Sequence, residues 1–461
     1  MRAGQNQGAW LEELKQGLHQ SEVEANSSNP LDNLRREAVE ALMTEPLPFR
    51  KMERWRYTPV DGLFKLPLNI LKHKPANDTG YDELFGMGLD SHRFAVIDGH
   101  AHFLGNASEL PAGVIFSTMH DATVNHEALL SQYAGKAMSQ QGTQNRLQAS
   151  LVNKDSKLFQ YLNQSVSPDG IFIHVPEGIK LEKPVEVVFF KSGNQADLVQ
   201  THSVVVLEKD AAMTLHEKHV DEEASHSFCN NQLEMIIDDN ASLQHYYLQQ
   251  QGNSCWHRQG MHRIQAEASR YRGWYGCCGS QWSRLETTVI FSGDNAQSDV
   301  QGIQLALDGQ VSDIHLDTRH DQPGCHSEQH FRGLVTGKSK IVFDGNITVS
   351  QDAQKTIAHL SDNNLMLTRN AEVDAKPQLE IYADDVQCSH GTSIGELDEQ
   401  QVFYLRSRGI SEQQARNLLS IGFVAEQIDK IELESFRQYM LDLLEIQLQA
   451  AKKSENADDG R

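Results

Sequence analysis

The sequence predicts a mainly β protein with a parallel β-solenoid at its core and helices on either side. Between residues 166 and 395, short runs rich in Val, Ile, Phe and Thr alternate with polar residues, and no helical stretch separates them. Four of these runs end in an acidic residue or Asn followed by alanine, at Ala211, Ala241, Ala268 and Ala296. The intervals of 30, 27 and 28 residues are typical of stacked coils, in which a small residue fits a tight corner. An antiparallel sandwich with hairpins of similar spacing is the alternative.

The change of texture along the chain divides it into three predicted regions. Residues 1–165 form an N-terminal helical or mixed domain, 166–395 the solenoid core, and 396–461 a C-terminal helical domain with a polar, unstructured tail. In the first region, Asn29 followed by Pro30 is a typical helix start.

The segment at 50–63, RKMERWRYTPVDGL, mixes basic and aromatic side chains. Such a mixture suits nucleic acid, but the chain as a whole is strongly acidic. We therefore expect Trp55 and Tyr57 to pack against the next domain.

The charge of the chain excludes several classes of partner. It has 41 Lys and Arg against 63 Asp and Glu, a formal net charge of −22. An acidic surface repels phosphate backbones and anionic lipids, so we expect no nucleic acid and no membrane partner. The N-terminus lacks the apolar core of a secretory signal, and the apolar runs are only of strand length. Because six cysteines are too few for a disulfide framework, we expect reduced thiols in a cytoplasmic protein.

Three amphipathic helices are predicted after the β region. Asp398 and Gln401 form a capping-box pattern ahead of the first, Gly409 is its expected C-cap, and Ser411 and Gln414 repeat the box for the second. Such helices either cap the stack, which a solenoid needs for solubility, or dock a partner. From the residues alone the two hypotheses are equal.

The most informative segment is 379–410, LEIYADDVQCSHGTSIGELDEQQVFYLRSRGI. Cys388 and His390 lie two apart at the end of a strand-like run, so their side chains should share one face, with Ser389 opposite. Sulfur beside imidazole nitrogen suits iron, zinc or copper(I), and also iron–sulfur clusters. By spacing alone, a structural strand end with a packed cysteine explains such a pair more often.

A second candidate metal site is formed by Cys325 and His326, in a segment predicted to be a loop that also contains His320 and His330. Loops contribute functional residues more often than strands do. No Cys-x-x-Cys pair occurs in the chain, so a closed tetrahedral zinc site has no nucleus in the sequence.

Two other motifs are interpreted as structural. Cys277 and Cys278 are neighbours on a predicted strand, so one thiol should be buried and the other exposed. In GLVTGKS, three residues separate Gly333 from Gly337 where a phosphate-binding loop needs four, and a strand-like run follows. We expect a turn there and no nucleotide on this chain.

A Cys–His thiol hydrolase is disfavoured. The acidic residues Asp384 and Asp385 lie just upstream of Cys388 and would oppose the thiolate that such an enzyme needs.

With these residues in view, the chain resembles the SufB/SufD family of iron–sulfur cluster assembly proteins. The block at 360–423 follows the family pattern almost without gaps, with NNLML, AEVDAKPQLEIYADDVQCSHG and QVFYLRSRGIS. The segment at 50–63 is similar to the family's R-K-x-E-x-W-x-Y-T-P-x-x-G-L. Between them, residues 64–300 match mostly in their general pattern of apolar and polar residues. The C-terminal block is more similar to the SufD branch than to the SufB branch.

The resemblance implies a right-handed parallel β-helix between two helical domains, in agreement with the repeat. It implies a non-enzymatic scaffold subunit of the SUF complex, paired with a SufB-like paralogue and with two copies of an ABC-type ATPase, SufC. Such an assembly would drive de novo cluster formation and iron acquisition. The expected cargo is a transient iron–sulfur cluster shared with the partner, and a homodimer is expected when the chain is alone.

The resemblance also ranks the candidate site residues. His390 and Cys388 match the family's C-terminal Cys-Ser-His at the paralogue interface, with His390 the preferred ligand, while Cys325 and His326 rank lower. The ATPase is expected on the C-terminal helices, at Phe403, Leu405, Leu418, Leu419 and Phe423. The alternatives are a purely structural interaction subunit without ligands of its own, or a thiol hydrolase.

Overall fold

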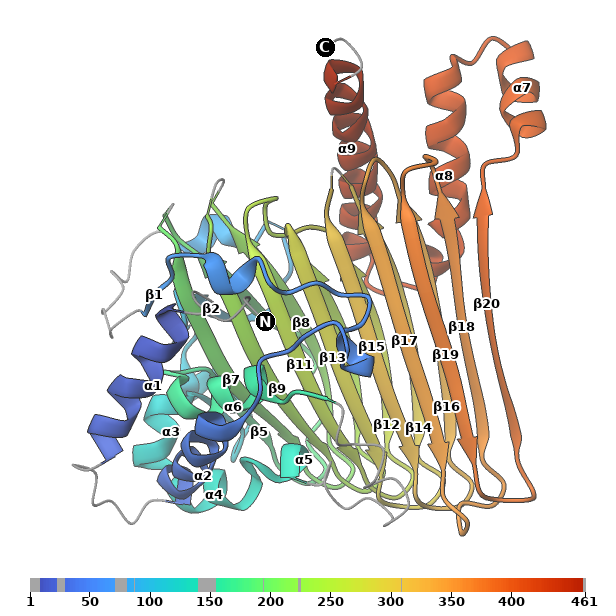
Figure 1. The fold of residues 1–461 in the computed structure, drawn as a ribbon. Coiled ribbons are helices and arrows are strands. Elements are labelled where there is room, and N and C mark those ends of the chain that lie inside the picture. The colour runs from blue at the N-terminus through green and yellow to red at the C-terminus, as the bar shows by residue number, and fades with distance from the viewer. Residues whose placement is uncertain are drawn as a thin grey trace.

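The computed structural model shows a parallel β-solenoid with helices at both ends of the chain (Figure 1). It describes residues 9–22, 30–70, 81–86, 88–139, 155–193, 195–222, 225–307 and 309–458. The N-terminal helices are α1 (Ala9–Glu22), α2 (Pro30–Thr44), α3 (Met119–Asn125), α4 (Glu127–Tyr133), α5 (Lys136–Ser139) and α6 (Leu158–Val166). The C-terminal helices are α7 (Glu399–Ser407), α8 (Glu412–Asp429) and α9 (Glu434–Asp458).

Eight coils form the solenoid, and each places one strand in each of two sheets. The first sheet contains β5 (Ile171–Val175), β7 (Asp197–Leu207), β9 (Phe228–Ile237), β11 (Trp256–Gln265), β13 (Trp282–Phe291), β15 (Val311–His320), β17 (Lys340–Val349) and β19 (Glu372–Ile381). The second contains β6 (Val185–Lys191), β8 (Ala212–Asp221), β10 (Ser242–Gln249), β12 (Arg270–Cys277), β14 (Gln297–Ala306), β16 (His326–Val335), β18 (Ile357–Met366) and β20 (Gln387–Glu396). Successive coils pair in parallel throughout, which confirms the solenoid and excludes the antiparallel sandwich.

Four short strands begin the two sheets. β1 (Asn69–Ile70) pairs in parallel with β7, and β2 (His92–Ile97) with β6. β3 (His100–Phe103) is antiparallel to β2, and β4 (Ile115–Thr118) is antiparallel to β5. The N-terminal region is therefore mixed and covers the first edge of each sheet.

The repeat in the sequence is a stack of corners that contain a left-handed residue. Asp210, Asn240 and Asn295 have φ values of 59°, 55° and 59°, and each precedes a buried alanine. Asn and Asp tolerate this conformation better than most residues. At the remaining corner, the third along the chain, the pattern is displaced by one residue. There Ala268 itself has the left-handed conformation, with a φ of 53°, and Ser269 is the buried residue. The corner N–H groups donate to carbonyls of the next coil, which joins the coils at the corner as well as along the strands.

The segment at 50–63 crosses the outer face of the first sheet and packs within the chain. Trp55 is 1% exposed, with the guanidinium of Arg284 3.9 Å from its ring centroid. Arg284 in turn donates to Asp313 on β15 at 2.8 Å. Tyr57 is half-buried, with the ammonium of Lys340 5.6 Å from its ring centroid. The predicted packing of these aromatic residues is confirmed.

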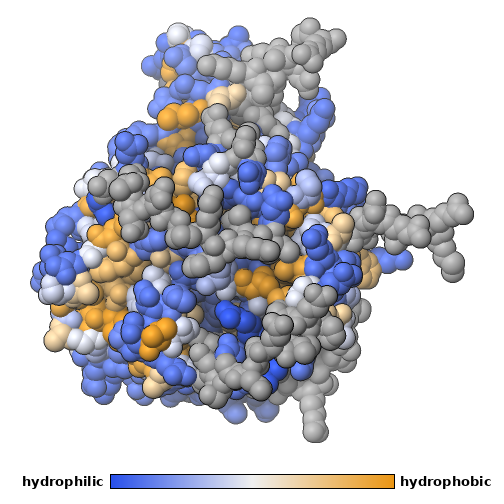
Figure 2. Space-filling model, turned by 90° about the vertical axis from the view of Figure 1, so that its left-hand side faces the viewer, coloured by the Kyte–Doolittle hydropathy of each residue, from blue (hydrophilic) through white to orange (hydrophobic). Residues whose placement is uncertain are grey.

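Two of the N-terminal helices, α5 and α6, lie against early coils of the same sheet. Helix α6 contacts β7 and β9, and α5 contacts β9 and β11. Figure 2 views the molecule from the side on which the N-terminal helices lie. The surface there is mainly hydrophilic and is interrupted by hydrophobic areas.

Helices α8 and α9 lie on the outer face of the second sheet and do not cover the end of the stack (Figure 1). The indole N–H of Trp274 on β12 donates to the carbonyl of Gln427 at 2.8 Å, and Phe436 packs edge-on against the same ring. The capping hypothesis is therefore wrong in its geometry, because the helices attach to the side of the solenoid.

The local signals of the C-terminal helices are largely confirmed. Ser411 and Gln414 form the predicted capping box, and Gly409 has a φ of 87° at the end of α7. Asp398 caps α7 by accepting the N–H of Gln400 at 2.8 Å. The tail predicted to be unstructured continues α9 as far as Asp458.

The last coil leaves both sheets with free edges. In the described residues, β19 pairs only with β17 and β20 only with β18, and most residues of β20 are exposed. An uncovered pair of ten-residue edge strands is a ready surface for pairing with another chain.

One coil before this end, Asp362 on β18 is fully buried. One carboxylate oxygen accepts the amide N–H of Asn364 at 2.6 Å, and the other has no partner. Burial in this position raises the pKa of Asp362 to about 7.

Asp362→Asn should stabilise the fold more at pH 8 than at pH 5, by about 2–3 kcal/mol. The folded-state pKa of Asp362 is raised, so the stability present at low pH is lost as the pH rises toward about 7. The amide cannot ionise and removes this loss. Urea unfolding at both pH values measures the difference, and Asp384→Asn in the exposed last coil is the control. An equal effect at the two pH values would contradict the assignment.

Asp313→Ala should lower the free energy of unfolding by about 3 kcal/mol, because it leaves the buried Arg284 without one of its carboxylates. It also removes the acceptor of the Thr58 hydroxyl, at 2.6 Å. Glu432→Ala breaks an exposed pair with Arg272 and should cost at most about 1 kcal/mol. Similar small losses for both variants in urea unfolding would show that the 50–63 segment is not anchored there.

Candidate functional site at the open end of the solenoid

Cys388 and His390 lie on β20 and face the space between the two sheets. The strand register pairs Cys388 with Ala358 and His390 with Leu360, and both of these partners are buried in the core. Since side chains of neighbouring coils stack, the pair continues an inward-facing row. Because no further coil covers them in the described residues, His390 is exposed and Cys388 half-buried. The two side chains share a face, as the spacing predicted.

Ser389 points to the outer face of the same strand. Its hydroxyl lies 2.7 Å from Nδ1 of His359, the residue in register with it on β18. The Cys-Ser-His motif thus has an inner side that carries the thiol and the imidazole, and an outer side that holds a second histidine.

The surroundings of Cys388 do not favour the thiolate that nucleophilic catalysis needs. Burial raises the pKa of this thiol, which keeps it protonated at neutral pH. A protonated thiol is a weak nucleophile, whereas a bound metal ion displaces the proton. Sulfur and imidazole nitrogen on one face are donor types that suit iron or an iron–sulfur cluster.

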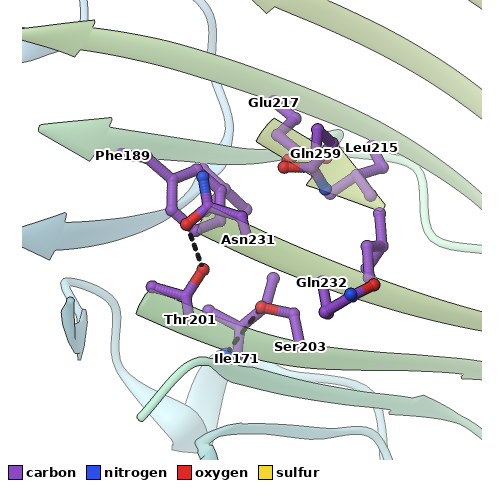
Figure 3. A pocket seen from close by; sticks show the side chains of 11 residues that line it. Ile171, Phe189, Thr201, Ser203, Leu215, Glu217, Asn231, Gln232 and Gln259 are labelled. Carbon is purple, nitrogen blue, oxygen red and sulfur yellow. Dashed lines mark hydrogen bonds between the residues drawn. The ribbon is translucent and has the colours of Figure 1, made fainter. Parts of the chain in front are cut away.

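Deep inside the first coils, the space between the sheets is closely filled. A cavity of about 10 Å³ there has room for about one water molecule and is lined by Thr201, Asn231 and Glu217, among others (Figure 3). Burial alone would raise the pKa of Glu217, but hydrogen bonds from His219 and His245 lower it to about 2. This cavity is too small for a cluster or cofactor.

The structure separates the members of the second candidate site. Cys325 follows the left-handed Gly324 and fills the buried corner position that alanine holds in other coils. Burial raises the pKa of its thiol to about 11. His326 begins β16 and lies on the outer face, while His320 is buried against the Ser327 hydroxyl at 2.9 Å. The segment is a corner between two strands, and the Cys325 thiol, which lies against the carbonyl of Gly293, is apart from His326 on the outer face.

The vicinal cysteines correct one prediction. Cys277 and Cys278 do belong to different packing clusters on the two sides of the sheet, but both are buried. Cys278, on the outer side, is covered by α9, where Gln447 donates to its carbonyl at 3.2 Å. The second part of GLVTGKS, from Thr336 to Ser339, is the predicted turn between β16 and β17, and its first three residues end β16.

The five residues expected to bind the ATPase divide into two groups. Phe403 is 70% exposed and Leu418 is 54% exposed, whereas Leu405 and Leu419 are half-buried. Phe423 packs against the helix–sheet core, with the guanidinium of Arg332 5.3 Å from its ring centroid. The free apolar surface of this region therefore centres on α7 and the start of α8.

Sequence reasoning missed His359 and Asp362, which lie one coil below the Cys-Ser-His motif. Register places them opposite Ser389 and Thr392. The period of about 30 residues contained this information, since the residue 30 before Ser389 is His359.

In the part of the chain that the structure describes, no three His, Cys, Asp or Glu side chains already converge as a metal site. None of the described helices has the length and apolar character needed to cross a membrane.

Comparison with known proteins identifies the family. Residues 189–423 match the family described as "SUF system FeS cluster assembly, SufBD core domain", and residues 17–187 match "SufBD protein N-terminal region". The chain is 28% identical to the iron–sulfur cluster assembly protein SufD of Escherichia coli K12, over 93% of this chain and 95% of that protein. It is 31% identical to the chloroplastic protein ABCI7 of Arabidopsis thaliana, over 88% and 83%. It is 24% identical to SufD of Bacillus subtilis, over 90% and 93%. The chain therefore belongs to the SufBD family of the SUF iron–sulfur cluster assembly system.

Proposed function

We propose that this chain is a non-enzymatic scaffold subunit of a SUF complex. It pairs with a SufB-like paralogue, presents His390 and Cys388 to a nascent iron–sulfur cluster, and recruits a SufC-like ATPase. The observation that carries the proposal is the uncovered last coil, which ends in an exposed imidazole beside a half-buried thiol.

The open end supports pairing with a second solenoid. Parallel edge strands of matching length on a paralogue would satisfy the free backbone groups of β19 and β20 and bury the exposed side chains of Ile381, Tyr382 and Ile394. A cluster formed in this seam would take ligands from both chains. A second copy of this chain offers the same edges, so the chain would pair with itself when the paralogue is absent.

His390 is the leading ligand and Cys388 assists it. The imidazole is exposed, whereas the thiol is half-buried and has a raised pKa. An exposed imidazole nitrogen can bind iron directly, whereas the thiol must first lose its proton. The six cysteines of the chain are all free thiols, which suits a reducing, cytoplasmic setting.

The apolar surface of α7 and α8 supports the docking of an ATPase. Phe403, Tyr404 and Leu418 are each more than half exposed, on helices that attach to the side of the solenoid and leave its end free. A partner bound there would not compete with the paralogue. ATP hydrolysis in such a partner could then move the C-terminal helices and open or close the seam.

A purely structural subunit, with all cluster ligands on the paralogue, is the second candidate. The exposure of His390 on an inward-facing row that is otherwise buried favours a ligand role over this alternative.

His390→Ala should abolish cluster formation while the complex with the paralogue and the ATPase still assembles, because the side chain is exposed and holds no other part of the fold. Anaerobic reconstitution with iron and sulfide, followed by absorption spectroscopy, measures the cluster. His126→Ala, at the α3–α4 junction, is the control. Full cluster yield from a Cys388→Ala/His390→Ala double variant would support the purely structural alternative.

Phe403→Glu with Leu418→Glu should weaken ATPase binding by at least about tenfold, since both side chains would lose apolar contact on docking. Val124→Glu is the matched control, because Val124 is 73% exposed but lies on α3. Calorimetric titration with the purified ATPase gives both affinities. Unchanged affinity in the double variant would refute docking at this surface.

A further inference from the structure

Two imidazoles flank one carboxylate on the outer face of the second sheet, and a third imidazole lies in register with the carboxylate on the next strand. His326, Glu328 and His330 alternate along β16 and therefore share this face. Nε2 of His326 lies 3.2 Å from Oε1 of Glu328, and Nε2 of His330 lies 3.5 Å from Oε2. His359, on β18, is in direct register with Glu328. The side chains of the three β16 residues are 28–38% exposed, although Nε2 of His326 is itself buried.

In two of the three histidines, Nδ1 lies within hydrogen-bonding distance of a serine hydroxyl. Nδ1 of His330 is 2.7 Å from the Ser361 hydroxyl, and Nδ1 of His359 is 2.7 Å from the Ser389 hydroxyl. Metal-binding histidines typically use their second ring nitrogen in this way, because the hydrogen bond fixes the tautomer and leaves Nε2 as the metal-binding nitrogen. In both residues Nε2 remains for a metal ion.

The distances in the cluster suit a small cation. Bonds of about 2.0–2.2 Å to a tetrahedral ion place neighbouring ligand atoms about 3.3–3.6 Å apart. The Glu328–His330 separation of 3.5 Å already has this value. No three such side chains in the described residues converge as they stand, so binding requires His359 to turn its Nε2 toward Glu328. Asp299, in register with Glu328 on β14, adds negative charge nearby.

We propose that Glu328, His330 and His359 bind a divalent transition-metal ion such as Zn²⁺ or Fe²⁺, with His326 beside them. Two positions on one strand and a third on its neighbour provide three ligands from one face, and imidazole with carboxylate suits these metals. The site is distinct from the open end, because Cys388 and His390 face the interior of the solenoid. Ser389 links the two sites, because it lies between Cys388 and His390 in the chain and its hydroxyl contacts the ring of His359.

The test is Co²⁺ binding to the full-length, tag-free protein, followed by visible absorption and equilibrium dialysis. Cys388→Ala and His390→Ala are present in the parent, so that the open end cannot take the metal. We expect one Co²⁺ per chain, displaced by Zn²⁺. His330→Ala and His359→Ala should each weaken binding by about 100-fold or more, and Ser389→Ala by about tenfold.

His126→Ala serves as the matched control and should bind Co²⁺ as the parent does. Circular dichroism verifies that each variant is folded, and Glu328→Gln, which preserves side-chain shape, provides a second ligand variant if a histidine variant unfolds. A parent that binds no Co²⁺, or equal affinity in parent and ligand variants, overturns the proposal.

Discussion

Parallel hydrogen bonding between coils about 30 residues apart is the constraint on which the rest of the structure depends. It stacks every residue over its equivalent one coil away, so inward-facing rows continue from the core to the last strand. His390 and Cys388 occupy the positions of two core residues, Leu360 and Ala358, at a point where the stack stops. Their accessibility thus follows from the architecture: the end of a solenoid exposes what its interior would bury.

The two helical regions leave this end free by attaching to the sides. The 50–63 segment is anchored on the first sheet through Trp55 and Arg284, and α8 and α9 are anchored on the second through Trp274 and Phe436. Each attachment buries aromatic rings against the outer faces of the coils. The solenoid is consequently protected along its length and at its start, while its C-terminal edges remain available.

Much of the fold could be predicted from the sequence, because the corners have a local chemical requirement. A left-handed residue followed by a small buried one favours Asn or Asp before Ala, and this pattern is visible at Asn240 and Asn295. The inner and outer sides of the Cys-Ser-His motif followed from strand alternation alone. What local patterns could not supply was long-range packing. The burial of Cys278 depends on α9, which lies far along the chain, and the role of Cys325 as a corner residue depends on its alignment with alanines of other coils.

The central claim is that the open end of the solenoid forms a seam with a second solenoid. Hydrogen–deuterium exchange of the backbone amides of β20, with and without the SufB-like paralogue, tests it most directly. Our account predicts strong protection across 387–396 when the complex forms, and no comparable change on the outer face of the first coils. A stable complex in which the amides of β20 exchange as fast as in the free chain would contradict it.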